Sequence, residues 1–436
     1  MEASKFRRVY TLCQQTGLIH FQHGQEGACL RASEVRPQLD RFLIKKFGGE
    51  EAMRTDPVMK KWFLSDKHPA LNYKMSIRGL GEPEKSTEIE AARKSIRNCG
   101  RTKCPKDRGE VKVERPIAKS YFGNMVQYNS NEEEYIREVE STYKETVFYR
   151  KGVLLTIVCF IDTLQQAIFD HLPAFFLLHN FGTRSDKGFG SFTVKECDGV
   201  EMKDRPEVLL KKECPFPIYL VNPKSCCEMR PLNNANELYK LMKSGVNQRG
   251  DYFRAFIYQY MHQAKPPVGN EKAWLKQNEI APAVGKPENA DWHENKRQGK
   301  SNITNYRYVR AVLGVGDTLR FMEPGNGTTE VSIKRIENGK TVERFRYASP
   351  VVFKIIDRKL FLLPFPVNPM ILDREFEFSS KKGKGILKTP ATFDMNDFIS
   401  CFAEYINSDC NPQKYDTNRK LSDAKSIQFR GTIEEV

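Results

Sequence analysis

The sequence lacks a hydrophobic run long enough to cross a bilayer as a helix. Its most apolar stretch, GVLLTIVCFI at residues 152–161, is about half of the roughly 20 residues that such a helix needs. The first residues, MEASKFRRVY, also lack the apolar core of a secretory signal. These absences argue against a membrane protein and lead us to expect a cytoplasmic one.

The chain also lacks a complete set of closely spaced zinc ligands, although it has 11 cysteines. Cys99 and Cys104 in CGRTKC form one pair, but no second pair follows to supply four ligands. The adjacent Cys226 and Cys227 would form a strained chelate. We therefore predict free thiols, no metal and no cofactor, and the sequence leaves open whether Cys99 and Cys104 bind a metal.

Negative charge is scarce relative to positive charge. Lys and Arg number 70 against 55 Asp and Glu, a net charge of +15. This excess favours a polyanionic partner, and without a membrane segment the expected partner is nucleic acid. A hydrophobic content of 39% is sufficient for folded cores, and 436 residues suit two domains.

The first half of the sequence shows two strand–helix–strand patterns. Apolar spacing predicts a strand at 6–12, a helix at 30–47 and a strand at 70–77, and then a strand at 152–161, a helix at 162–178 and a strand at 192–197. This order is typical of the split βαβ, ferredoxin-like arrangement.

The second half begins after a proline-rich connection at 214–223 and is also mixed. We predict helices at 234–263, 304–313 and 394–408, a hairpin turning at Asn338-Gly339, and strands at 351–356 and 360–364. The expected fold is α+β with two domains, of which the first is ferredoxin-like (RRM-like) and the second is mixed helix and sheet; the family resemblance described below implies the ferredoxin-like arrangement for both. The first spans 1–213, with a glycine-rich loop at 182–191 and an insertion at 79–150; the second spans 224–436, with an insertion at 265–301.

The segment HNFGTRSDKGFGSF, residues 179–192, combines glycines, cations and aromatic rings. It matches neither a Walker loop nor a dinucleotide fingerprint, because its letters differ and it runs from a helix to a strand. We predict that it contacts RNA through glycine N–H groups, cationic side chains and stacking rings, which are Gly182, Gly188, Gly190, Arg184, Lys187, Phe181 and Phe189. The alternative is a tight turn whose rings lie in the core.

In this context the segment GTRSDKGFGSF resembles the signature loop of the RAMP superfamily of CRISPR-associated proteins. The start QTGLIHFQHGQEGACLRASEVRPQLDRFL, the element RAVLG at 310–314, and ASPVVFKII followed by LFLLP are similar to other RAMP elements. The resemblance extends over roughly residues 5–363 and is closest to a tandem-domain subunit of a type III, Cmr-like effector. It implies two RAMP domains, antiviral defence, binding of guide RNA (crRNA) and possibly target RNA, and contacts with other effector subunits.

Catalysis is not expected from this pattern, although it is not excluded. His20 and His23 flank a glycine turn, and some RAMP ribonucleases use histidine without metal. We predict RNA contact for both, and His20 is the one catalytic candidate. Asp40 and Asp186 match the family's RNA-cutting loop aspartate poorly, and Asp186 is predicted as a turn residue. The alternatives are a metal-independent endoribonuclease that matures guide RNA, and a stand-alone RNA-binding protein.

Other basic residues complete the predicted RNA surface. Arg31 begins a series of cations along the first predicted helix, and Lys382 and Lys384 lie in KKGKGILK, which we predict to be a flexible loop.

Overall fold

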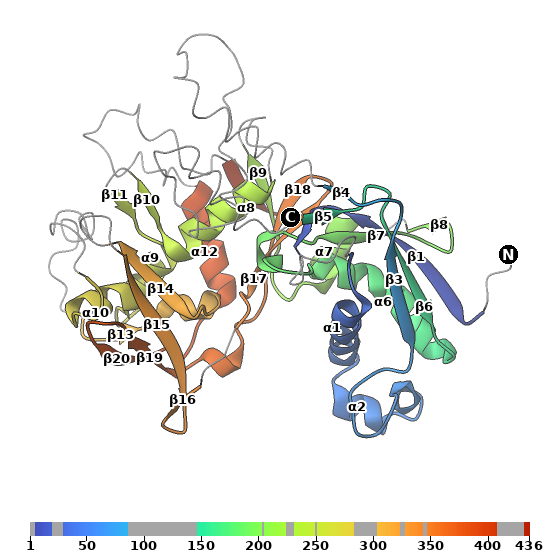
Figure 1. Cartoon of the computed structure of the whole chain (residues 1–436), viewed down its shortest axis with the longest axis horizontal. Coiled ribbons are helices and arrows are strands. Elements are labelled where there is room, and N and C mark those ends of the chain that lie inside the picture. The colour runs from blue at the N-terminus through green and yellow to red at the C-terminus, as the bar shows by residue number, and fades with distance from the viewer. Residues whose placement is uncertain are drawn as a thin grey trace, which may run out of the picture.

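The computed structural model describes residues 5–19, 29–85, 146–202, 205–223, 231–248, 251–282, 303–322, 328–342, 347–407 and 431–436. These residues form two lobes that lie side by side (Figure 1). The N-terminal lobe contains the elements up to β8, and the C-terminal lobe contains those from β9 onward.

The N-terminal lobe is built on one antiparallel sheet of five strands in the order β3-β6-β1-β7-β8. The strands are β1 (Arg7–Gln14), β3 (Lys74–Gly79), β6 (Val153–Val158), β7 (Phe192–Cys197) and β8 (Val200–Glu201). Helix α1 (Ala32–Lys46) connects β1 to β3, and α6 (Asp162–Leu178) connects β6 to β7. Each βαβ unit therefore has a strand of the other unit between its own strands, which confirms the predicted split arrangement.

Both helices cover the same face of this sheet. Strand β6 alternates between buried and partly buried residues, and its buried side packs with Tyr10 and Leu12 against α1 and α6. Leu39 of α1 and Ile168 of α6 are fully buried in this core. The alternation thus places the lobe's apolar side chains on a single face, as period-two burial requires.

The C-terminal lobe repeats this strand order. Its sheet runs β17-β18-β9-β21, formed by β9 (Tyr219–Pro223), β17 (Val351–Ile356), β18 (Lys359–Pro364) and β21 (Gly431–Glu435). In both sheets the chain's first strand lies between the third and the fourth. Helix α12 (Met395–Asn407) precedes β21. The second sheet begins within the proline-rich connection at 214–223.

A second C-terminal sheet and several short elements surround this unit. The sheet contains β14 (Thr318–Met322), β15 (Thr328–Glu337), β16 (Lys340–Val342), β19 (Glu375–Ser379) and β20 (Lys384–Lys388). The other helices are α2 (Glu50–Thr55), η1 (Met59–Trp62), η2 (Ser185–Lys187), α7 (Pro206–Glu213), α8 (Pro231–Tyr239), η4 (Lys240–Ser244), α9 (Phe256–Gln263), α10 (Glu271–Gln277), η5 (Val309–Leu313) and η6 (Pro369–Ile371). The other strands are β2 (Leu18–Ile19), β4 (Glu84–Lys85), β5 (Thr146–Phe148), β10 (Val246–Gln248), β11 (Asp251–Phe253), β12 (Gly269–Asn270) and β13 (Tyr306–Arg307).

Three sequence predictions for the C-terminal lobe need correction. The helix predicted at 234–263 is interrupted, because Gly245 adopts a φ of +72° and the short hairpin β10–β11 follows. The helix predicted at 304–313 contains the short strand β13 and a 3-10 turn. The segment KKGKGILK is not a loop throughout, because β20 pairs with β19 and Gly385 leaves room for the Trp274 ring. The Asn338-Gly339 turn is confirmed, with positive φ at both residues.

The lobes are joined through Lys354 of β17, whose side chain is fully buried. Its Nζ donates to Phe176 O at 2.7 Å, His179 O at 2.9 Å, Asn180 Oδ1 at 3.0 Å and Phe192 O at 3.2 Å. Burial lowers the pKa of Lys354. The oxygen ligands at the negative end of α6 favour the charged form, so we interpret the group as an ammonium. A cluster that includes Leu178 and Phe361 packs around the same junction.

We expect Lys354→Met to destabilise the chain by roughly 3 kcal/mol, because Met fills the space but leaves several buried oxygens without their donor. Urea unfolding followed by circular dichroism measures this loss. Lys359→Met is the matched control, since Lys359 lies on β18 with its side chain 57% exposed, and it should change stability by less than about 1 kcal/mol. Equal effects of the two substitutions would contradict the role assigned to Lys354.

Candidate nucleic-acid interface

The glycine-rich segment lies between the two lobes and connects α6 to β7. Gly182, Gly188 and Gly190 have φ values of +79°, +90° and +65°. A Cβ atom on Gly190 would lie 1.9 Å from Phe181 O, and one on Gly188 would lie 2.9 Å from Ile355 Cδ1 of β17. The glycines are therefore required for a left-handed backbone and for close packing against the chain itself.

The glycine N–H groups are occupied within the chain, which corrects the predicted phosphate cradle. Gly182 N donates to Glu34 Oε1 at 2.6 Å, Gly188 N to Ser185 O at 3.3 Å, and Gly190 N to Gly17 O at 3.0 Å. The segment folds back onto β2 and α1, and these bonds consume the donors that a phosphate would need. The three glycines shape the junction instead of lining an open anion site.

The two phenylalanines predicted to stack on bases are also buried. Phe181 is 0% exposed, and its ring packs against Phe176 and Phe192 in the N-terminal core. Phe189 is 1% exposed and belongs to the core cluster of the C-terminal lobe. Neither ring can stack on a base in this conformation. Both therefore match the alternative interpretation of the sequence, in which the rings of the segment lie in the core.

The cations of the segment, in contrast, meet cations of the other lobe. Arg184 precedes η2 and Lys187 ends it. Arg184 of the segment and Lys240 of η4 both lower the pKa of Lys187. The Lys187 Nζ lies 4.6 Å from the ring centroid of Tyr239, and the Lys243 Nζ lies 5.4 Å from the same centroid. We call Arg184, Lys187, Lys240 and Lys243 the cationic seam.

The pKa values of two seam lysines are lowered mainly by burial, and neighbouring positive charges lower them further. Burial lowers the pKa of Lys187 to about 8, and the charges of Arg184 and Lys240 act in the same direction. Burial lowers the pKa of Lys243 to about 7, helped by Arg310 and Lys187. The carboxylate of Asp186 opposes both shifts. A polyanion bound here would relieve the repulsion, so the arrangement suits phosphate groups.

Two neighbouring features have structural roles. Arg310, in the RAVLG element, is buried and forms an ion pair with the buried Glu271, which also accepts from Tyr258 and from Val309 N. The Lys243 ammonium donates to Leu313 O at 2.9 Å and Gly314 O at 2.6 Å. These bonds hold η5 against η4 and fix the position of the seam.

The remaining predicted site residues are not gathered at the seam. Arg31 directly precedes α1, where its carbonyl accepts from Glu34 N and Val35 N. Lys382 and Lys384 are exposed on the β19–β20 hairpin, and these two strands lie on the far side of the C-terminal lobe from β17 (Figure 1). His20, His23, Cys99, Cys104, Cys226 and Cys227 lie outside the described residues.

Sequence reasoning missed Lys240 and Lys243. The only signal for them is the three-residue spacing in KLMK, which places two lysines on one side of a helix. Within the ranges that the structure describes, three or more metal-ligating side chains do not come together, and no helix is long and apolar enough to span a membrane.

We expect Gly190→Ala to destabilise the chain by roughly 1–3 kcal/mol more than Gly199→Ala. Both glycines have positive φ, but a Cβ at Gly199 meets nothing within 4 Å, whereas one at Gly190 clashes with a backbone oxygen. The difference in urea unfolding free energy therefore isolates the close packing of the loop. Equal unfolding free energies for the two variants would show that a Cβ atom fits at Gly190, contrary to the structure.

Comparison with known proteins places both lobes in one family. A family model described as the Cmr1 N-terminal domain matches residues 5–246, and one described as the Cmr1 C-terminal domain matches residues 252–423. Both descriptions agree with the resemblance drawn from the sequence. No curated protein matches the chain.

Two solved structures are similar over most of the chain. The crystal structure of apo Cmr1 from Pyrococcus furiosus has 11% identity and a TM-score of 0.38, and covers 83% of this chain and 88% of that one. A chain of the Type III-B Cmr-beta complex, bound to cognate target RNA and AMPPnP in the presence of single-stranded DNA, has 10% identity and a TM-score of 0.36. That match covers 92% of this chain and 98% of the other.

Proposed function

Since the chain belongs to the Cmr1 family, we propose that it binds guide RNA, or the duplex of guide and target RNA, as a subunit of a type III CRISPR ribonucleoprotein. In this role it holds the phosphate backbone while base pairing reads the sequence, and it is not itself the nuclease. Its partners are the RNA and the other effector subunits.

The observation that supports this proposal is the cationic seam. Four cations from two different lobes lie at one junction, with the pKa of Lys187 and of Lys243 lowered to about 8 and about 7. Like charges that are brought together cost stability unless a partner compensates them. A nucleic-acid backbone, with one negative charge at each nucleotide, supplies that compensation. The Lys243 ammonium is bonded to Tyr239 Oη, Leu313 O and Gly314 O, so we assign the phosphate contacts to Arg184, Lys187 and Lys240.

We expect Arg184→Ala with Lys187→Ala to weaken RNA binding and to lower its dependence on salt. Each lost phosphate contact should reduce the slope of log affinity against log salt by about 0.7 for single-stranded RNA. Fluorescence anisotropy with a 12-nucleotide oligouridylate at several salt concentrations measures both quantities.

The matched control is Lys60→Ala with Lys61→Ala, which removes the same charge from an exposed turn. This control should leave the slope within error of the unmodified chain. A double seam variant that binds with an unchanged affinity and slope would refute the seam as the RNA site.

The lowered lysine pKa values predict that RNA affinity falls as the pH rises from 7 to 9. Above its pKa of about 8, Lys187 is neutral in the free chain and must take up a proton to pair with a phosphate. RNA affinity therefore decreases progressively through the pH range in which Lys187 deprotonates. Lys187→Arg should flatten the profile, because arginine stays charged. Binding by the unmodified chain that does not vary between pH 7 and 9 would contradict this assignment.

A further inference from the structure

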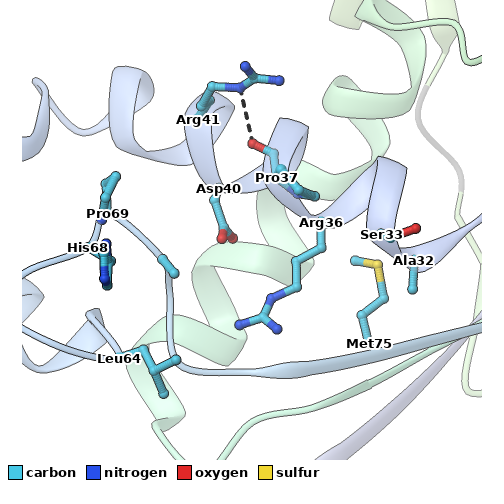
Figure 2. Close-up of a pocket in the computed structure, with 11 residues that line it drawn as sticks. Ala32, Ser33, Arg36, Pro37, Asp40, Arg41, Leu64, His68, Pro69 and Met75 are labelled. Carbon is cyan, nitrogen blue, oxygen red and sulfur yellow. Dashed lines mark hydrogen bonds between the residues drawn. The ribbon is translucent and has the colours of Figure 1, made fainter.

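A pocket of about 680 Å³ lies in the N-terminal lobe between α1 and the loop at residues 64–70. Its lining includes Arg36, Asp40 and Arg41 from the helix, and Leu64, His68 and Met75 from the loop and β3. Figure 2 shows Asp40 and Arg36 pointing into the space between these elements, whereas the Arg41 side chain extends away from them and donates to Pro37 O. This volume lies within the range of small-ligand pockets.

Asp40 is the polar group at the centre of this pocket, although only 6% of its surface is exposed. Its Oδ1 accepts from Tyr73 Oη at 2.8 Å and its Oδ2 accepts from Leu71 N at 3.3 Å. An ionised carboxylate has about four acceptor positions, so two bonds leave room for further donors. Burial raises the pKa of Asp40, which shows that its charge is incompletely solvated in the free chain.

The rest of the pocket combines cations with apolar walls. The Arg36 Nη2 donates to Leu71 O at 3.0 Å, and the guanidinium lies 5.1 Å from the Tyr73 ring centroid. Arg41 is exposed and donates from Nε to Pro37 O at 3.2 Å. Leu64 is 60% exposed and supplies part of the apolar wall. The pocket lining therefore combines one carboxylate and two arginines with the apolar side chains of Leu64 and Met75.

We propose that this pocket binds the guanine base of a ribonucleotide, with Asp40 accepting hydrogen bonds from the N1–H and 2-amino groups. Guanine carries these two donors side by side, so both carboxylate oxygens gain a partner. Cytosine and adenine place a ring acceptor beside their single amino group, and uracil places a carbonyl on each side of its N–H. Arg36 lies where it can approach the guanine O6 or N7, and Arg41 lies where it can approach the phosphate.

Guanine can reach the pocket in two forms, as a free nucleotide or as a base turned out from an RNA strand. Turned-out bases of single-stranded RNA are commonly read by their hydrogen-bonding edges. The RNA form rests on the proposed function, whereas the free-nucleotide form does not. Binding is therefore measured with GMP, AMP, CMP and UMP, and with 12-nucleotide oligouridylates with and without one central guanosine.

We expect the full chain to bind GMP, or the guanosine-containing oligonucleotide, about tenfold or more tightly than the matching uridine ligand. A preference only among mononucleotides identifies the free form, and a preference only among oligonucleotides identifies the RNA form. Asp40→Asn, which replaces an acceptor by an amide donor, should abolish the preference. Asp170→Asn is the control, because Asp170 is an exposed carboxylate on α6. The all-uridine oligonucleotide reports the cationic seam separately, so its failure does not affect the GMP result.

Arg41→Ala separates phosphate recognition from folding, since Arg41 is exposed and its Nε donates to Pro37 O of its own helix. It should weaken GMP about fivefold or more and leave guanosine, which lacks the phosphate, unchanged. Arg78→Ala, an exposed arginine on β3 outside the pocket, should change neither. The proposal is overturned if no guanine ligand is preferred, or if the preference survives Asp40→Asn in a folded protein.

Discussion

The relative position of the two lobes depends on one buried ammonium, that of Lys354. Its four oxygen ligands come from the end of α6 and the start of β7, while the lysine itself belongs to β17 of the other lobe. Few other side chains can satisfy so many carbonyl oxygens at one point, because an ammonium has three donors and no acceptor. The charge of Lys354 also lies at the negative end of the α6 dipole. Removal of the lysine would leave these buried oxygens without their donor at the junction of the two lobes.

The glycine-rich segment completes the same junction by covering an exposed sheet edge. Strand β17 is the edge strand of its sheet, and its outer carbonyls would otherwise be unpaired. Asn180 Nδ2 donates to Phe353 O at 2.9 Å, and Ser191 Oγ donates to Ile355 O at 2.6 Å. The segment thus acts as an interdomain clasp, meaning that it binds along the edge of β17 and joins the two lobes. Its glycines permit the close approach of the segment to β17. Its cations Arg184 and Lys187 lie between the two residues that bond β17, in the part of the segment that forms η2.

The fold was more predictable from the sequence than the site was. Apolar spacing predicted the strands, the helices and the split βαβ order of the first half, because burial on one face enforces the periods of 2 and 3.6. The family resemblance and the α+β class are likewise confirmed. The strand order of the second sheet was not visible, since β9 and β17 are separated by more than 120 residues that hold other elements.

Local sequence could not distinguish an RNA loop from an interdomain clasp, because both need glycine, and the decisive contacts come from distant residues. The donors of Gly182 and Gly190 are taken by Glu34 and Gly17, which no local pattern links to them. One signal was available. Lys354 is the single charge in the apolar strand VVFKII, and a lone charge in a buried strand implies specific partners.

The two proposed sites recognise different parts of a nucleotide: the seam binds the phosphate and the pocket binds the base. The seam is formed by like-charged side chains, whose attraction for phosphate does not depend on the base. The pocket is formed by a carboxylate held in place by Tyr73 and Leu71, and fixed acceptors discriminate between bases because an unmatched buried group loses its hydrogen bonds. The two sites are structurally linked through α1. This helix lines the pocket, and its Glu34 accepts from Gly182 N of the glycine-rich segment, which carries two of the seam cations. Tyr73 and Leu71 already hold the Asp40 carboxylate in the free chain, so base discrimination at the pocket would require little further ordering of that side chain.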